Sequence, residues 1–320
     1  MDLIYMNDSR EDVGILHDYK LDLAYGADEN DFELRIPSSA HCCGKGFFLY
    51  MEGTEYGGIV DEIASDTDAE EVTYTGRTWH GLLNSKIIEP DAGQGYLVLS
   101  GEANAVLGAL ITRLGLGDLF ATSGEPSGLN ISNYKMNRYI PAYEGIRKML
   151  KTEKGKLRFA FKGGKVVLSA HPRGDYTQDG NLDSDLVDLK VKRHYNAVNH
   201  LICLGRGELA AREVIHLYAD ADGNISKSQT FTGIDERSSV YDNSSAESLE
   251  DLESGGIDRL KELSLADEVD AAFDEDSDQY EVQDLVGATD NIIGLTVTAE
   301  ITKKIVTIEN GQITISYKVG

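Results

Sequence analysis

The sequence is poor in cysteine, proline and tryptophan, with 3 Cys, 5 Pro and 1 Trp among its 320 residues. A small, odd number of cysteines without regular spacing argues against a disulfide framework and favours synthesis in a reducing compartment. Proline is scarce while glycine is abundant, at 33 residues, and Val, Ile, Tyr and Thr recur in short runs. This combination indicates many short strands joined by Gly, Asn and Asp turns.

Long apolar segments and positive charge are also lacking. No run approaches 18 consecutive apolar residues, and the N-terminal MDLIYMNDSREDVGIL has no basic segment before an apolar one, so we expect neither a membrane span nor a signal peptide. The 30 basic residues face 55 acidic ones, giving a formal net charge of -25. Such a surface repels phosphate backbones, so we expect no sequence-specific nucleic-acid binding, although DNA can pass nearby without sticking.

Residues 1–95 show the pattern of antiparallel strands. In FELRIP, the side chains of Phe32, Leu34 and Ile36 alternate with polar ones, and GFFLYMEGTEYGGIVDEIASD predicts a hairpin that turns near Glu52-Gly53. EEVTYTGRTWHGLL continues the pattern as a further strand, beside which Trp79 is expected in the core. Several short strands in one block favour a barrel or sandwich.

Residues 96–174 predict a small α/β insert. SGEANAVLGALITRLGL has helical periodicity with Ser100 as a plausible N-cap, and PAYEGIRKMLKTEKG predicts a second helix with Pro141 in its first turn. KLRFAFKGGKVVLSAHP then predicts a hairpin around Gly163-Gly164.

Strand patterns return in residues 175–320. A helical insertion interrupts them at about 244–266, where Gly255-Gly256 makes two short helices as plausible as one. Near the C-terminus, Asn310-Gly311 lies between two alternating runs and predicts a hairpin. The fold class expected is therefore β-rich α+β, with two strand-rich blocks that flank a small α/β insert.

Metal-ligating patterns are weak. In YADADGNISKSQTF, Asp220, Asp222 and Asn224 fit the first three ligand positions of an EF-hand loop, but Ile225 stands where glycine is needed and Phe231 where a glutamate is needed. Alternation on both flanks predicts a hairpin there instead. A further candidate, HCCG at 41–44, offers Cys42 and Cys43, but adjacent cysteines are expected to point apart and Cys203 is the only other thiol.

Catalytic and phosphate-binding patterns are equally weak. Among the seven histidines there is no HExxH arrangement, and His194 and His200 are expected as polar residues at strand ends. CGKGFF and LGLGDLF lack the spacing of phosphate loops, and GEPSG places Ser127 wrongly for a nucleophile elbow. In DEVDAAFDEDSDQYE the carboxylates crowd one polar segment, which predicts a solvated loop and not two carboxylates in different environments. We expect no catalytic, cofactor-binding or metal site.

The order of elements resembles the siphovirus-type phage tail hub family, which is similar in architecture to the central hub of contractile baseplates. The resemblance is carried by FLYMEGTEYGGIVDEI in the first half and, in the second, by HYNAVNHLICLGRGELAAREVIHLYADADGNIS, SLEDLESGGIDRLKEL and YEVQDLVGATDNIIGLTVTAEITKKIVTIENGQITISYKVG. It covers nearly the whole chain. One departure is Gln283, which replaces the glycine of a typical V-G-D-I-V stretch and is expected to alter a turn.

The resemblance implies two tail-tube-like β-barrel domains, at 1–95 and 175–320, with 96–174 inserted between them. It implies a homotrimer at the virion tail tip, made in the host cytoplasm, that meets the hexameric tail tube and surrounds a channel for DNA or the tape-measure protein. Distal tail, tail tube, tape-measure and tip or fibre proteins are the implied partners, and no enzymatic activity is implied. The alternative is a cell-wall hydrolase or carbohydrate-binding module of the adsorption apparatus of a phage or prophage.

Overall fold

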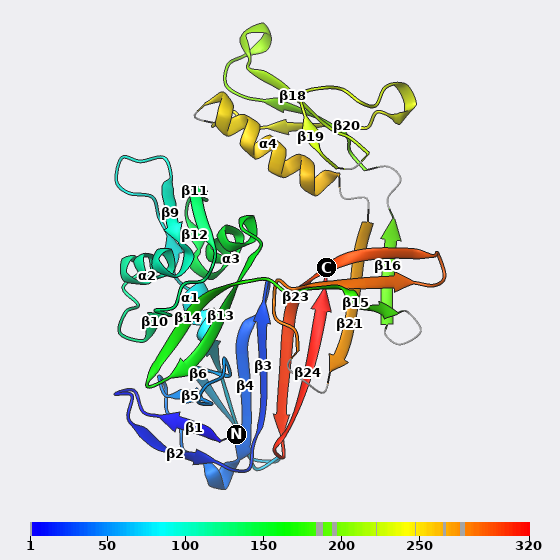
Figure 1. The fold of residues 1–320 in the computed structure, drawn as a ribbon. Coiled ribbons are helices and arrows are strands. Elements are labelled where there is room, and N and C mark those ends of the chain that lie inside the picture. Colours follow the sequence, from blue (N-terminus) through cyan, green and yellow to red (C-terminus); the bar gives the residue numbers. More distant parts are fainter. Residues whose placement is uncertain are drawn as a thin grey trace. The chain divides into compact units, whose positions relative to one another are not determined.

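Strands form most of the regular structure in this computed structural model, which describes residues 2–183, 188–193, 197–221, 223–246, 248–264, 267–275 and 279–320 (Figure 1). The prediction of a β-rich chain with few helices is confirmed. The chain divides into two units, residues 1–189 with 270–320 and residues 190–269. The division falls within β16 (Asp188–Arg193) and β21 (Asp267–Glu275).

One large sheet runs through the first unit in the order β21-β24-β23-β3-β4-β7-β6-β5-β1-β2, and β22 pairs with both β23 and β15. These strands are β1 (Leu3–Met6), β2 (Asp12–Leu16), β3 (Lys20–Gly26), β4 (Asn30–Pro37), β5 (Phe48–Tyr50), β6 (Gly57–Asp66), β7 (Glu71–Thr78), β15 (Asp175–Asp183), β22 (Leu285–Asp290), β23 (Leu295–Glu309) and β24 (Gln312–Val319). The long β23 pairs with β22 through its first half and with β24 and β3 through its second. Sequence-distant strands therefore share one sheet.

Turn residues stand where the sequence predicts them. Gly53 has φ of +80° between β5 and β6, and Asn310 and Gly311 have φ of +52° and +77° between β23 and β24. Positive φ at both central residues is the requirement of the type I′ two-residue hairpin turn, which Asn-Gly readily meets. Both predicted hairpins are confirmed.

The run EEVTYTGRTWHGLL is not one strand. β7 ends at Thr78 and helix α1 (Trp79–Asn84) begins at once, with the Thr78 side chain accepting a hydrogen bond from the Gly81 amide. The threonine is an N-cap, which alternation alone does not reveal. Trp79 is fully buried on this helix, so its expected place in the core is confirmed.

A smaller layer of helices and short sheets joins the same core. It contains α2 (Ala103–Arg113) and α3 (Ala142–Thr152), with the strands β8 (Ile87–Ile88), β9 (Leu97–Glu102), β10 (Phe120–Thr122), β11 (Asn130–Met136), β12 (Ile140–Pro141), β13 (Gly155–Lys162) and β14 (Lys165–Pro172). Both helices and the Gly163-Gly164 hairpin between β13 and β14 are confirmed. The N-cap of α2 is not Ser100, which lies in β9, but Glu102, whose carboxylate accepts from the Ala105 amide.

The second unit is a four-stranded sheet with one helix. Its order is β19-β18-β17-β20, from β17 (His200–Leu204), β18 (Val214–Ala219), β19 (Ile225–Ser226) and β20 (Ser238–Asp242). Helix α4 (Leu249–Leu263) is continuous through Gly255 and Gly256, so the two-helix alternative is wrong. A Cβ at Gly256 would lie 2.4 Å from the Cys203 sulfur, which explains a glycine at this helix–sheet contact. None of the helices in the described part of the chain combines the length and apolarity needed to cross a membrane.

Candidate functional site

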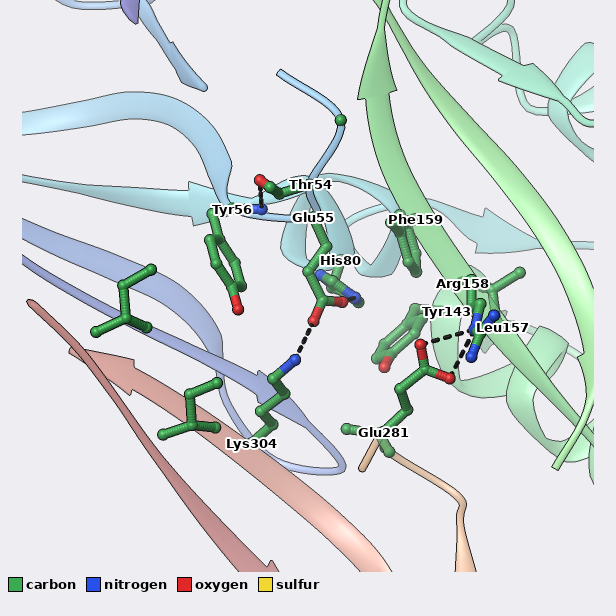
Figure 2. A pocket seen from close by; sticks show the side chains of 14 residues that line it. Thr54, Glu55, Tyr56, His80, Tyr143, Leu157, Arg158, Phe159, Glu281 and Lys304 are labelled. Carbon is green, nitrogen blue, oxygen red and sulfur yellow. Dashed lines mark hydrogen bonds and ion pairs between the residues drawn. The ribbon is translucent and has the colours of Figure 1, made fainter. Parts of the chain in front are cut away.

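A cavity of about 340 Å³ lies in the first unit where segments from distant parts of the chain meet (Figure 2). Its walls come from the turn before β6, from α1, α3, β13, β23 and β24, and from the segment before β22. Its lining combines aromatic and aliphatic side chains with ionisable ones: Tyr56, Tyr143, Leu157, Phe159, Ile313 and Ile315 with Glu55, His80, Arg158, Glu281 and Lys304.

Glu55 and Lys304 form the central ion pair of this cavity. The Lys304 ammonium donates to the Glu55 carboxylate at 2.8 Å, and the lysine side chain is only 2% exposed. Across the carboxylate, His80 Nε2 lies 3.5 Å from the second oxygen of Glu55. Figure 2 shows the carboxylate between the two nitrogens. The pair thus connects the β5–β6 turn to β23 and α1.

Burial and the neighbouring charges shift the pKa values of Glu55 and His80. Burial alone would raise the pKa of Glu55, but the charge of Lys304 and the hydrogen bond from His80 lower it to about 2. Burial lowers the pKa of His80 more than Glu55 raises it, so the imidazole is neutral and donates through Nε2. Its ring lies between Tyr25 and Phe159, at centroid distances of 4.7 Å and 3.8 Å.

A second buried ion cluster lies nearby, on β13. The Lys156 ammonium binds both oxygens of Asp284 at 2.7 Å and 2.9 Å, with side chains 3% and 0% exposed, and also contacts Glu281. Glu281 in turn accepts from the Arg158 guanidinium at 2.7 Å. This cluster fastens the segment before β22 to the small layer.

Gln283, which replaces the expected glycine, lies beside that cluster. Its φ is +81°, a left-handed conformation that glycine adopts at little cost. The side chain is buried, and its amide donates to the Arg147 carbonyl at 3.1 Å. The glutamine therefore keeps the glycine-type backbone and adds a bond to α3.

The chemistry of the cavity does not favour hydrolysis. A glycosidase acid needs a raised pKa in an apolar environment. Glu55 is held ionised by Lys304, and Glu281 is occupied by Lys156 and Arg158. The two carboxylates serve as partners of buried cations, which is a structural arrangement.

The calcium-loop candidate is part of a hairpin. β18 and β19 pair antiparallel, and the Asp220 carboxylate accepts from the backbone amide and the side chain of Asn224. Asp222 lies outside the described residues. Throughout the part of the chain that the structure describes, no three His, Cys, Asp or Glu side chains are grouped so as to hold a metal ion.

The histidine and cysteine candidates differ in outcome. His200 begins β17, as expected, and its ring bonds Glu236 at 2.6 Å and His216 at 2.8 Å, whereas His194 lies outside the described residues. The expectation that Cys42 and Cys43 point apart is wrong, because their sulfur atoms are 3.6 Å apart. The Tyr74 hydroxyl accepts hydrogen bonds from the amides of both cysteines and so holds their backbone.

Sequence reasoning assigned no role to Glu55, Lys304, Lys156 or Asp284. One signal was present: Lys304 is in phase with Val306 and Ile308, the buried positions of β23. A lysine at an inward strand position requires a buried anion. Nothing in the sequence identifies Glu55 as that anion.

The large sheet has one apolar face and one polar face. Directly opposed residues share a face, and one polar row crosses six strands through Glu62, Thr75, Glu33, Asp22, Thr307 and Thr314. The next polar row contains Ala64, Thr73, Arg35, Lys20, Glu309 and Gln312. Between these two rows lies the apolar row of the other face: Ile63, Tyr74, Leu34, Leu21, Ile308 and Ile313.

Acidic side chains gather on the polar face. A hollow of about 470 Å³ over β3, β4 and β7 is lined by Asp22, Glu29, Asp31 and Glu33. Burial and the neighbouring Glu29 raise the pKa of Asp31. We call the two polar rows and these hollow-lining acids the polar sheet face.

The Lys304–Glu55 pair is tested by removing one partner. Lys304→Met leaves the Glu55 carboxylate buried without its cation, and we expect the free energy of unfolding to fall by about 3–5 kcal/mol. Adding Glu55→Leu to Lys304→Met should restore most of the loss. Urea unfolding followed by fluorescence of the single Trp79 measures both, since Trp79 belongs to the same core.

The matched control is Lys148→Met, which removes an exposed pair with Glu144. That change should stay within about 0.5 kcal/mol. A Lys304→Met protein as stable as Lys148→Met would show that the buried pair contributes nothing.

Acid provides a second test of the same pair. The pKa of Glu55 is lowered from 4.5 to about 2 on folding, so its carboxylate stabilises the fold above about pH 4.5 and this stabilisation is lost as the pH falls toward 2. Urea midpoints of the unmodified protein and Glu55→Gln should differ at pH 6 and converge near pH 2. A gap that stays constant over this range would contradict the assigned pKa.

No protein-family model and no curated protein sequence matches the chain. Several solved structures are similar to the chain.

The 43 kDa tail protein of prophage MuSo2 from Shewanella oneidensis is 12% identical with a TM-score of 0.59, over 100% of this chain and 98% of that one. The prophage tail protein gp18 from Listeria monocytogenes is 11% identical with a TM-score of 0.55, over 99% and 94%. A tail protein from Neisseria meningitidis is 10% identical with a TM-score of 0.54, over 99% and 95%. The chain has the fold of these phage and prophage tail proteins, which confirms at the level of fold the resemblance seen in its sequence.

Proposed function

We propose that the protein is a structural hub of a phage or prophage tail. Three copies form an adaptor at the tail tip that joins the hexameric tail tube to the distal tip and surrounds the genome channel. The observation that carries this proposal is the fold shared with tail proteins over nearly their full length. The protein acts by assembly and not by turnover, in agreement with a cavity whose carboxylates are committed to buried cations.

In this proposal residues 1–95 and 175–320 supply the two tube-like barrel domains, which share one sheet through β3 and β23. Residues 96–174 are the small insert, and about 244–266 is a helical insertion. Two such domains in each of three copies would offer six tube-like units to a hexameric tube. The partners are the tail tube, tape-measure, distal tail and tip or fibre proteins, on a particle assembled in the host cytoplasm.

We assign the polar sheet face to the channel wall. The other face of the sheet carries buried side chains such as Leu21, Leu34 and Tyr74, whereas the polar rows present Thr, Glu and Asp side chains. Acidic side chains repel the phosphate backbone of DNA, and hydroxyl groups do not neutralise it. Because no counterions are released, DNA gains little affinity for this face and can slide along it. The net charge of -25 means that the chain as a whole also repels phosphate groups.

Assembly state tests the hub. Light scattering on the purified protein should give the mass of three chains, or a monomer that forms three-chain rings when tail tubes are added. Negative-stain micrographs should then show threefold rings at tube ends. A stable dimer that forms no ring on tubes would refute the proposal.

Charge reversal tests the channel assignment. Glu33→Lys with Glu62→Lys places cations on the polar sheet face, and assembled rings should bind duplex DNA about tenfold more tightly at low salt, with the gain lost as salt rises. Glu250→Lys with Asp258→Lys makes the same charge change on exposed positions of α4. Equal DNA binding by the two double variants would contradict a channel lined by the polar sheet face.

A further inference from the structure

The paired cysteines lie in the segment between β4 and β5 and are both reduced. Their sulfur atoms are 3.6 Å apart, Cys42 is half-buried and Cys43 is 2% exposed. The Tyr74 hydroxyl accepts from the Cys42 amide at 3.1 Å and from the Cys43 amide at 3.3 Å, and it bonds His41 at 2.7 Å. These three hydrogen bonds to one buried phenol fix the backbone of both cysteines, on which the two sulfur atoms lie 3.6 Å apart.

This geometry fits a bond between the two sulfur atoms better than a metal site. A zinc site needs three or four ligands, and no third His, Cys, Asp or Glu joins the thiols to make a metal-binding group within the described residues. A covalent S–S bond, in contrast, needs an approach of only about 1.5 Å from the present separation.

We propose that Cys42 and Cys43 are a reversible oxidation site, a vicinal dithiol that small-molecule disulfides convert to a disulfide between the two neighbouring residues. The Cys42 thiolate attacks one sulfur of the small disulfide RSSR, whose S–S bond breaks and releases one RS⁻. The Cys43 thiolate then attacks the Cys42 sulfur and releases the second RS⁻. Two protein thiols are oxidised, RSSR is reduced, and the two thiol protons leave on two RSH molecules.

Exposure sets the order of these steps. Cys42 can be reached from solvent, whereas Cys43 is enclosed and is limited to attacking its neighbour. Burial raises the pKa of both thiols, so thiolate is scarce at neutral pH and the first step is slow.

The product should also be easily reduced. Cα atoms of adjacent residues are about 3.8 Å apart, which is closer than the roughly 4.4–6.8 Å of ordinary disulfides. A strained disulfide has a more oxidising potential than a structural one. The pair would therefore stay reduced in a glutathione-rich cytosol and close in an oxidising medium, whatever the function of the protein.

The experiment uses the intact folded protein and oxidised glutathione. After incubation at pH 8, the protein is denatured, alkylated and mapped by peptide mass. In the peptide that contains Cys42 and Cys43, we expect neither cysteine to be alkylated, the mass to be lower by two hydrogen atoms, and no glutathione to be attached. Treatment with dithiothreitol should make both cysteines alkylatable again. Closure should speed up about tenfold per pH unit between pH 7 and 8. The buried, solitary Cys203 serves as the internal reference and should remain alkylatable.

Cys43→Ser is the matched control, with Cys43→Ala as a second version in case the hydroxyl disturbs the fold. Without the resolving thiol, the reaction should stop at a stable glutathione adduct on Cys42, which also proves that the reagent reaches this residue. A persistent adduct on Cys42 of the unmodified protein would overturn the proposal. So would two thiols that remain alkylatable after the same incubation.

Discussion

The antiparallel pairing of β3 with β23 is the constraint on which the first unit depends. It brings the N-terminal strands and the C-terminal hairpin into one sheet, and Thr307 donates across it to Asp22 at 2.6 Å over 285 residues of sequence. Lys304 of the same strand β23 favours this register, because a shift by one residue would turn its side chain to the polar face and leave the Glu55 carboxylate without that cation. The cavity of Figure 2 is the region where this sheet meets the small layer.

Buried ions in this protein specify an arrangement more than they add stability. Taking Lys156, Asp284 and Lys304 out of water costs several kcal/mol each, and paired charges recover that cost only in one geometry. Both ion clusters join segments that are remote in the sequence and unrelated in local structure. An arrangement that separates Lys304 from Glu55 or Lys156 from Asp284 leaves a buried charge unpaired. The two ion clusters therefore disfavour wrong packing of these segments against one another.

A sheet with one buried apolar face and one polar face agrees with the proposed role in tail assembly. The apolar row is used for the core, so the polar sheet face is free for whatever passes or docks there. Acidic side chains there, and the overall acidity of the chain, agree with contact that does not become binding. The Cys42–Cys43 segment differs from the rest of the first unit in holding two thiols 3.6 Å apart, which is the basis of the proposed oxidation site.

Local structure could be predicted from the amino-acid order alone: the alternation of β4, the Asn310-Gly311 turn, the periodicity of α3 and the hairpin at Gly163-Gly164 all depend on near neighbours. Local patterns gave the wrong answer at Thr78, which ends a strand and caps a helix, and at Cys42 and Cys43, whose sulfur atoms lie side by side on a backbone bonded to the distant Tyr74. The choice of Glu55 as the anion for Lys304 and of β23 as the partner of β3 arises only in the folded chain. Those choices are made by burial and long-range pairing, which depend on residues more than 200 positions apart and leave no periodic trace in the sequence.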